Sequence, residues 1–240
     1  GYDVFTTFDS AEIALFSTDE VAAISDKAIA GLTTATVASL GTDKLAALTT
    51  KQIAALSSSQ LNALTSAQLT SLGTDKIAAL SAKQLAGVST GQIAGLSTTQ
   101  VASLGAKQIA AFTTAQAAAL NTAQVEALTS SQVAALSAAA LKTIDSAELA
   151  LFSTDELAAI SDKAIAGLET AALASLGTDK LAALNTKQMA ALSSAQLGAL
   201  SSTQLNSLSS DKLGVLSAKQ LAGLTTGQVA GLSTTQVASL

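Results

Sequence analysis

Residues 48–55 read LTTKQIAA, and this eight-residue pattern, here called an octad, decides how the chain folds. Followed outward in both directions, the pattern recurs from Phe8 to Ser239 as 29 consecutive octads with no insertion. The consensus is L-[ST]-[ST]-x-Q-[LIV]-[AG]-[AS], and positions 1 to 8 are counted from the leucine. So short and regular a period indicates one small structural unit stacked many times.

A longer repeat lies over the octads. Residues 10–103 return with substitutions as residues 146–239, a shift of 136 residues or seventeen octads. Because the shift keeps the octad phase, we take the octad as the structural unit. We therefore expect a non-consensus N-terminal segment over residues 1–7 and a single continuous octad solenoid over residues 8–240.

The apolar positions of the octad exclude two simple folds. In a continuous α-helix each octad turns the apolar pair at positions 1 and 6 by about 80° more than two full turns, so no apolar stripe survives. In a β-strand positions 1 and 6 have opposite parity and point to opposite faces. Neither a long amphipathic helix nor a strand array fits the spacing.

The polar positions instead predict a new helix in every octad. Position 2 is Ser or Thr and position 5 is Gln or Glu in most copies, which is the capping box of a helix N-terminus. The apolar residue at position 1 then packs on the one at position 6 as a hydrophobic staple. All sixteen glutamines of the chain lie at position 5, and Glu169 is the one poor residue for the N-cap at position 2.

These features predict an all-α solenoid of very short capped helical turns, one for each eight-residue repeat. A single turn is not stable alone, because helix nucleation is costly, so its stability has to come from stacking. We expect positions 1 and 6 to line the interior and positions 3 and 4 to face water. The number of octads in one turn of the solenoid does not follow from the sequence.

The composition excludes several functions. A net charge of −5 and only 2% aromatic residues argue against nucleic-acid binding. Ser, Thr and Gln interrupt every apolar run, so we expect no membrane span, and the chain starts with no signal-peptide pattern. Without His or Cys we expect no enzyme, no cofactor, no metal site and no small-molecule ligand.

A few residues remain as candidate sites. The Gln row at position 5 and the Thr and Ser rows at positions 2 and 3 could contact a ligand, although helix capping explains them better. The Asp-Lys pairs, of which Asp43-Lys44 is one, read as a solvated face. Tyr2, Phe5 and Phe8 cluster near the N-terminus and are the candidate interface.

Residues 48–56 and 128–136 both read L-T-x-x-Q-[IV]-A-A-L, and residues 224–232 differ from that pattern only at Gly231. This resembles the short Leu-Thr-x-x-Gln repeats of very large bacterial surface or secreted proteins, often labelled adhesin-like or haem-utilisation proteins. The resemblance implies a bacterial, extracellular, structural or adhesive role. The haem label gains no support from the residues, because only Tyr2 and Met189 could offer an axial ligand.

The expected function is therefore structural: an extracellular or cell-surface protein forming a stalk, spacer or filament subunit. Its partners would be further copies of itself or neighbouring repeat chains. The alternative is an adhesin or other binding module that contacts a glycan, ice or a cell surface through its Thr and Gln rows.

Overall fold

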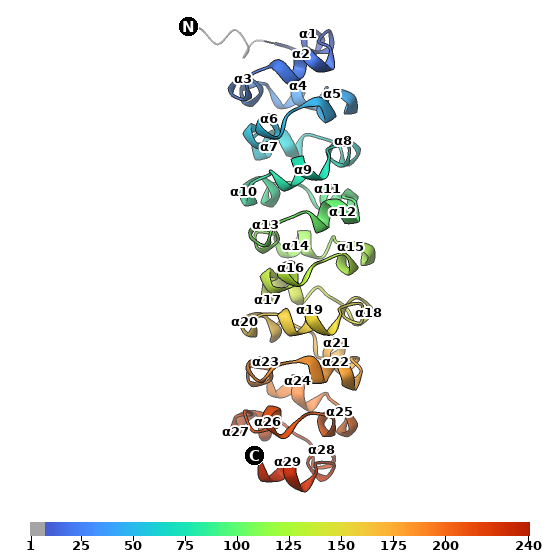
Figure 1. The fold of residues 1–240 in the computed structure, drawn as a ribbon, viewed down its shortest axis with the longest axis vertical. Helices are drawn as coiled ribbons and strands as arrows, with labels where there is room; N and C mark the ends of the chain where they lie inside the picture. The colour runs from blue at the N-terminus through green and yellow to red at the C-terminus, as the bar shows by residue number, and fades with distance from the viewer. Residues whose placement is uncertain (1–7) are drawn as a thin grey trace. The chain divides into compact units, whose positions relative to one another are not determined.

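The computed structural model describes residues 8–240, and over that range the chain is all-α, with no strand. Each octad contributes one helix of four to six residues, from α1 near the start to α29 near the end (Figure 1). The predicted solenoid of short capped helical turns is confirmed. Within the described range, residues up to 127 and residues 128–240 form two compact units, called unit 1 and unit 2 here.

The helices of unit 1 are α1 (Ser10–Ala14), α2 (Thr18–Ala23), α3 (Asp26–Gly31), α4 (Thr34–Ala38), α5 (Thr42–Ala47), α6 (Thr50–Ala55), α7 (Ser58–Asn62), α8 (Ser66–Thr70), α9 (Thr74–Ala78), α10 (Ala82–Ala86), α11 (Thr90–Gly95), α12 (Thr98–Ala102), α13 (Ala106–Ala110), α14 (Thr114–Ala117) and α15 (Thr122–Glu126). The helices of unit 2 are α16 (Ser130–Ala135), α17 (Ala138–Leu141), α18 (Ser146–Leu149), α19 (Thr154–Ala159), α20 (Asp162–Ile165), α21 (Thr170–Ala174), α22 (Thr178–Ala183), α23 (Thr186–Ala191), α24 (Ser194–Gly198), α25 (Ser202–Asn206), α26 (Ser210–Leu213), α27 (Ala218–Leu221), α28 (Thr226–Ala230) and α29 (Thr234–Ala238).

Helix α6 shows how the octad starts and stops a helix. The Thr49 hydroxyl accepts the backbone N–H of Gln52 at 3.2 Å, and the Gln52 side chain accepts the N–H of Thr49 at 2.7 Å. The helix ends at Leu56, whose extended backbone (φ −63°, ψ 140°) leads into the next N-cap. In most other helices the C-cap comes one or two residues earlier, as Ala63 does for α7, so the next N-cap always follows within three residues and the period stays short.

The cap varies where position 2 varies. Glu169, the predicted poor cap, makes no side-chain capping bond, and neither do Ser161 and Ser209. The glycines at position 2 likewise offer no capping oxygen, although the helices after them still form. The stack therefore tolerates single uncapped turns, as expected when packing rather than local capping supplies most of the stability.

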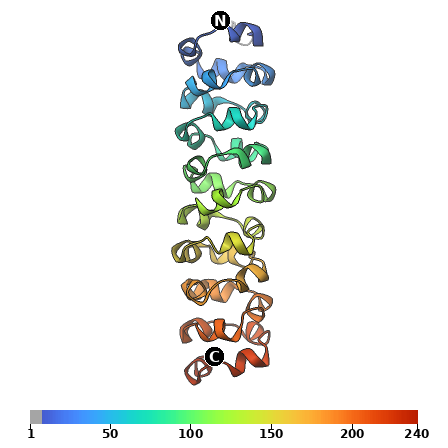
Figure 2. The ribbon, with the colours of Figure 1, turned by 90° about the vertical axis from the view of Figure 1, so that its right-hand side faces the viewer.

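Within each unit every helix packs on the third helix after it along the chain, as in α1 on α4, α3 on α6 and α16 on α19 (Figures 1 and 2). Side-chain hydrogen bonds between successive turns join residues 25 apart, as in Ser66 to Gly91, and 28 to 31 apart, as in Gln52 to Val21 and Ile24. One turn of the solenoid therefore takes between three and four octads.

The core of each unit is the pair of apolar rows at positions 1 and 6, as predicted. Leu45 at position 6 is 0% exposed and Leu48 at position 1 is 1% exposed. Burying such a side chain contributes about 1.5–3 kcal/mol, so one octad cannot offset the backbone entropy of its own ordering and depends on its neighbours. The prediction of one continuous solenoid over residues 8–240 concerns how the units join, and it stays a prediction.

Candidate functional site

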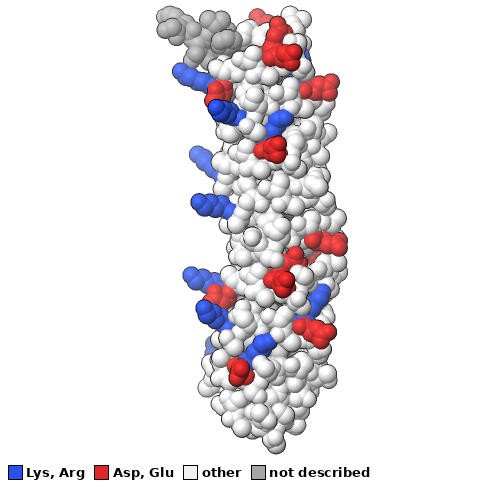
Figure 3. Space-filling model, in the orientation of Figure 1, with Lys and Arg blue, Asp and Glu red and all other residues white. Residues whose placement is uncertain are grey.

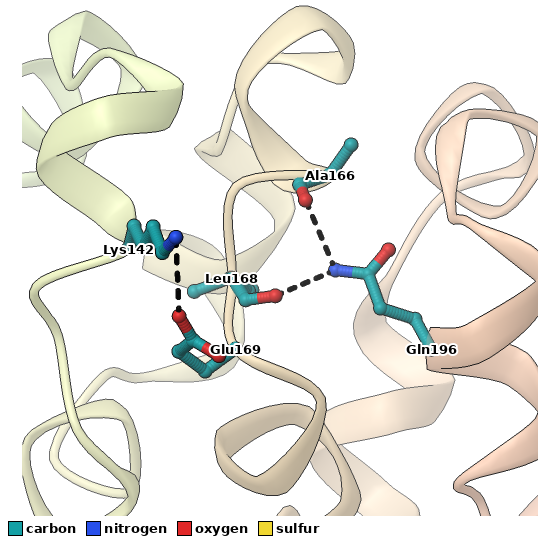
Figure 4. Close-up of polar contacts among 5 residues, drawn as sticks. All are labelled: Lys142, Ala166, Leu168, Glu169 and Gln196. Atoms are coloured by element: carbon teal, nitrogen blue, oxygen red, sulfur yellow. Dashed lines mark hydrogen bonds and ion pairs between the residues drawn. The ribbon is translucent and has the colours of Figure 1, made fainter.

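The side chain at position 5 joins one turn of the solenoid to the next, and Gln196 of α24 shows how (Figure 4). Its Oε1 accepts the backbone N–H of Ser193 at 2.8 Å, which completes the capping box of its own helix. Its Nε2 donates to the carbonyl oxygens of Leu168 at 2.8 Å and Ala166 at 3.4 Å, at the end of α20. One amide thus serves the start of one helix and the end of another.

This double use suits a primary amide. Every helix leaves N–H groups unpaired at its start and C=O groups unpaired at its end. The amide of Gln offers an acceptor for the first and two donors for the second. Gln196 is 1% exposed, yet no buried side-chain nitrogen or oxygen of residues 8–240 lacks a hydrogen-bond partner. The buried amides therefore avoid the desolvation cost of an unpaired polar group.

The same arrangement recurs through both units. The glutamines that donate to the end of a helix in the preceding turn are Gln52, Gln60, Gln68, Gln84, Gln92, Gln100, Gln108, Gln116, Gln124, Gln188, Gln196, Gln204, Gln220, Gln228 and Gln236. The Gln row, weighed above as a ligand-binding row, has its amides turned inward and used within the chain.

Four octads carry Lys at position 5. In these octads the side chain still donates to the preceding turn, but it no longer accepts the N–H of its own N-cap. The Lys44 ammonium donates to the carbonyl oxygens of Ile13 and Ala14, at the end of α1. Lys76, Lys180 and Lys212 make the equivalent bond to Ala46, Ala150 and Ala182. An ammonium has no acceptor, so it cannot complete a capping box, but a cation at a helix C-terminus is favoured electrostatically.

In octads with Glu at position 5, the side chain accepts the N–H of its own N-cap and makes no donation to the preceding turn. The Glu20 carboxylate accepts the backbone N–H of Ser17 at 2.7 Å and its hydroxyl at 2.9 Å. The backbone hydrogen bond from Ser17, and then the hydroxyl bond, lower the pKa of Glu20 below its ordinary value. A carboxylate has no proton to donate, so it offers nothing to a preceding turn. Glu12, Glu20, Glu148 and Glu156 open the two copies of the duplicated block.

The hydroxyl rows have two separate uses. At position 2 the hydroxyl caps its own helix, as predicted, except at Ser161 and Ser209. At position 3 some serines reach the turn that follows, as Ser66 does to the Gly91 carbonyl at 3.0 Å and Ser194 to the Lys219 carbonyl at 3.0 Å. These serines are half-buried, so position 3 is less uniformly solvated than the octad pattern predicts.

Of the candidate interface at Tyr2, Phe5 and Phe8, the first two lie outside the described residues. Phe8 is half-buried, and its ring meets that of Phe16 edge to face with 5.2 Å between the centroids. Its carbonyl oxygen accepts the Thr36 hydroxyl at 3.4 Å. The described part of this cluster packs on the first turn of unit 1, and the interface itself stays a prediction.

Unit 2 has two shallow hollows at helix ends. One of about 240 Å³ is lined by Gln196 and by Lys142 and Glu169, which form an ion pair at 3.9 Å (Figure 4). The other, of about 330 Å³, lies beside Gly177 and Lys180. Lys142 and Glu169 keep 71% and 53% of their side-chain surface exposed, so water screens the pair and it adds little stability.

Residues 8–240 hold no group of three or more His, Cys, Asp and Glu side chains that could bind a metal ion. No helix among them has both the length and the apolar character that crossing a bilayer requires.

The sequence was compared with known proteins. A search of curated proteins returns no match. The profile of the ALTTAQ repeat matches eight times, over residues 29–58, 37–74, 77–114, 106–138, 164–194, 173–210, 181–218 and 189–226, and these segments together cover well over half of the chain. The six letters of that name correspond to position 8 of one octad and positions 1 to 5 of the next, which read ALTTKQ at residues 47–52. The chain belongs to the ALTTAQ repeat family.

Proposed function

We propose that the protein is a structural, non-enzymatic component of the bacterial cell surface or extracellular space, where it acts as a stalk, spacer or filament subunit. The observation that carries this proposal is the use of position 5. The side-chain amides of Gln92 and Gln124 donate hydrogen bonds to the preceding turn, and both side chains are 2% exposed or less. These amides hold the turns together, so they are not free to bind a ligand.

The uniformity of the octads supports the same role. A binding or catalytic centre needs some units to differ from the others, whereas positions 1 and 6 stay apolar, and position 2 is Ser or Thr in most octads, from Phe8 to Ser239. The chain has no His or Cys to supply a general base or a thiolate nucleophile. These features favour a scaffold over an enzyme.

The placement outside the cell rests on the resemblance to large bacterial surface proteins with Leu-Thr-x-x-Gln repeats. Immunogold labelling of intact cells of the source organism tests it, with permeabilised cells as the control. Label on intact cells is the expected result, and label confined to permeabilised cells overturns the location.

The alternative function is adhesion to a glycan, ice or a cell surface. With the Gln amides turned inward, an adhesin would depend on exposed hydroxyls such as Thr98 and Thr234. Asp26, Ala82 and Ala106 interrupt that row at position 3, which argues against matching a regular lattice.

Negative-stain electron microscopy of the purified chain separates the two functions. The structural role predicts fibres or long uniform rods, and the same preparation should bind no glycan on an array and no ice surface. Isolated particles that bind one of these surfaces, and that lose binding when Thr98 and Thr234 are replaced by Ala, would establish the adhesin instead.

A further inference from the structure

Exposed lysines at position 4 follow the pitch of the solenoid. The spacings between Lys27, Lys51, Lys83 and Lys107 are 24, 32 and 24 residues, and those between Lys163, Lys187 and Lys219 are 24 and 32. Because a turn takes between three and four octads, each step advances about one turn, and the lysines stay on one side. We call the two sets the lysine columns of unit 1 and unit 2. Figure 3 shows lysines projecting from one edge within each unit.

Local helix stability does not account for these lysines. Position 4 is the second residue of each helix, close to the N-terminus, where the helix dipole favours Asp and disfavours Lys. Lys51, Lys83 and Lys107 are exposed, and they make no ion pair with any residue in the described range. Their regular return at a locally unfavourable position indicates a use outside their own helices.

Aspartates at position 4 form columns of the same pitch. The spacings between Asp19, Asp43 and Asp75 are 24 and 32 residues, and Asp155, Asp179 and Asp211 repeat them in unit 2. All six are exposed. Lys44, which follows Asp43, is half-buried and bonded to carbonyl oxygens of the preceding turn, so the surface of that octad is dominated by the carboxylate. We call these sets the aspartate columns.

The two kinds of column cannot pair within a unit. Each aspartate precedes a lysine of the column by eight residues, as Asp43 precedes Lys51. One octad is between a quarter and a third of a turn, so the columns face different directions around the axis. In each unit of Figure 3 most acidic residues lie away from the lysine edge. Within a unit, opposite columns therefore do not meet.

We infer that the protein associates side by side with further copies of itself, the lysine column of one copy lying against the aspartate column of the next. Both columns place a charge about every 8–10 Å, the usual spacing of packed helices, so several pairs form in one alignment. A single exposed ion pair is weak. In a row of pairs, forming the first pair aligns the two molecules, so the later pairs form with a smaller loss of entropy. Because the two faces differ, the contact is heterologous and leaves each copy with a free column for another neighbour.

A long acidic polymer is the competing partner for the lysine columns. The chain carries a net charge of −5, and its aspartate columns would repel such a polymer at every turn. A second copy of the chain offers carboxylates to the lysine column and ammonium groups to the aspartate column, and both are spaced at the same pitch. The observations therefore favour self-association.

Sedimentation velocity of the full chain at rising concentration tests the inference. The wild-type protein should associate at low salt and dissociate near 1 M salt, where the Debye length falls to about 3 Å. Replacing Lys51, Lys83, Lys107, Lys187 and Lys219 by Gln should weaken association on the order of a hundredfold. The matched control lowers the net charge by the same five units with Glu at exposed position 4 residues outside the columns: Ala35, Ala67, Ala123, Ala171 and Ala195. The control should associate far more strongly than the lysine variant.

A charge-swap experiment gives a gain of association. One variant carries Asp at the same five lysines, and a second carries Lys at the six aspartates of the columns. Neither should associate alone, and an equimolar mixture should form salt-sensitive complexes. Circular dichroism of each variant checks that the helices are retained. Equal weakening in the lysine variant and its control, or no complex in the mixture of folded variants, would overturn the inference. Wild-type chains that stay monomeric until polyglutamate is added would assign the columns to an acidic polymer.

This inference rests on the proposed structural role for its biological use, but its failure is separate from the failure of that role. Rods that appear in micrographs without salt-sensitive association would leave the structural role intact and reject the columns. Salt-sensitive association by a chain that also binds a glycan would support the columns and reject the structural role.

Discussion

The double use of the amide at position 5 leads to a sharp prediction for Gln92→Glu. In the wild-type protein Gln92 Oε1 accepts the Ser89 N–H at 2.8 Å, and Nε2 donates to the carbonyl oxygens of Leu61 and Leu64 at 2.8 Å and 2.7 Å. A carboxylate keeps the first bond, as Glu20 does with Ser17, and loses both donations. The substitution therefore removes only the link between turns.

The magnitude follows from these contacts. Two lost hydrogen bonds account for about 0.5–1.5 kcal/mol each. Gln92 is only 2% exposed, so the new carboxylate is desolvated beside the negative end of α7, which adds a further penalty. We expect a total loss of about 3–5 kcal/mol in the free energy of unfolding near neutral pH.

The loss depends on pH with a defined sign. Burial and the nearby carbonyl oxygens raise the pKa of the new carboxyl in the folded state above its unfolded value of about 4.3. The deficit is therefore full above the raised pKa and shrinks as the pH falls, because the protonated group is neutral and can donate one bond. Urea denaturation followed by circular dichroism, at about pH 5 and about pH 8, compares variant and wild type under each condition.

Gln92→Lys is the matched control. Lys44 shows that an ammonium at position 5 can reach the preceding turn, so this variant keeps a donor and loses the capping acceptor. We expect a loss of about 1 kcal/mol that does not change over this pH range. Hydrogen exchange over α7 and α11 should locate the weakening in Gln92→Glu at the contact between those turns. A Glu variant as stable as wild type, or a Lys variant equally destabilised, would refute the bridging role.

Two further predictions concern packing and capping. A Cβ added to Gly167 would lie 2.1 Å from the Ala138 carbonyl oxygen, so Gly167→Ala should lower the free energy of unfolding by about 1–3 kcal/mol in urea denaturation. Gly227→Ala, where nothing lies within 4 Å, should raise it by up to about 1 kcal/mol. Ser17→Ala should raise the pKa of Glu20 only part of the way to its ordinary value in an NMR titration, because the larger contribution comes from the backbone N–H. Since the folded pKa of Glu20 is lowered, its stabilising effect is lost as the pH falls through that value, and Glu20→Gln should remove this acid sensitivity.

Local chemistry made most of the fold predictable. The capping box joins residues three apart and the staple joins residues five apart, so both can be read within one octad. In α6 the capping box is formed, and the staple residues Leu48 and Ile53 are both buried. Burial at positions 1 and 6 follows from the same local geometry. Residues 1–7 carry no such pattern, and of the candidate interface residues only Phe8, which opens the first octad, can be placed, against Phe16.

The contacts between turns could not be derived in the same way. They join residues 25 to 31 apart, and their partners depend on how many octads make one turn, which no local rule fixes. One signal in the sequence pointed to them. Lys replaces Gln at position 5 in four octads, and Lys shares with Gln only the ability to donate, which capping does not use. A capping role alone would have favoured Glu at those places.

The octad separates what holds the stack together from what faces the outside. Positions 1 and 6 supply the core and hold apolar residues alone, position 2 caps the helix in most octads, and position 5 joins the turns where it is Gln or Lys. Position 4 takes no part in these contacts, and the helix that contains it forms whether the residue is Lys51, Asp75 or Gly91. A substitution at position 4 changes the charge at one defined place around and along the solenoid axis and leaves the fold unchanged. If the columns determine self-association, two repeat chains of this family should prefer different partners when their residues at position 4 follow a different order. Replacing the position 4 residues of one chain by those of another should then change its partner preference, with no substitution in the core.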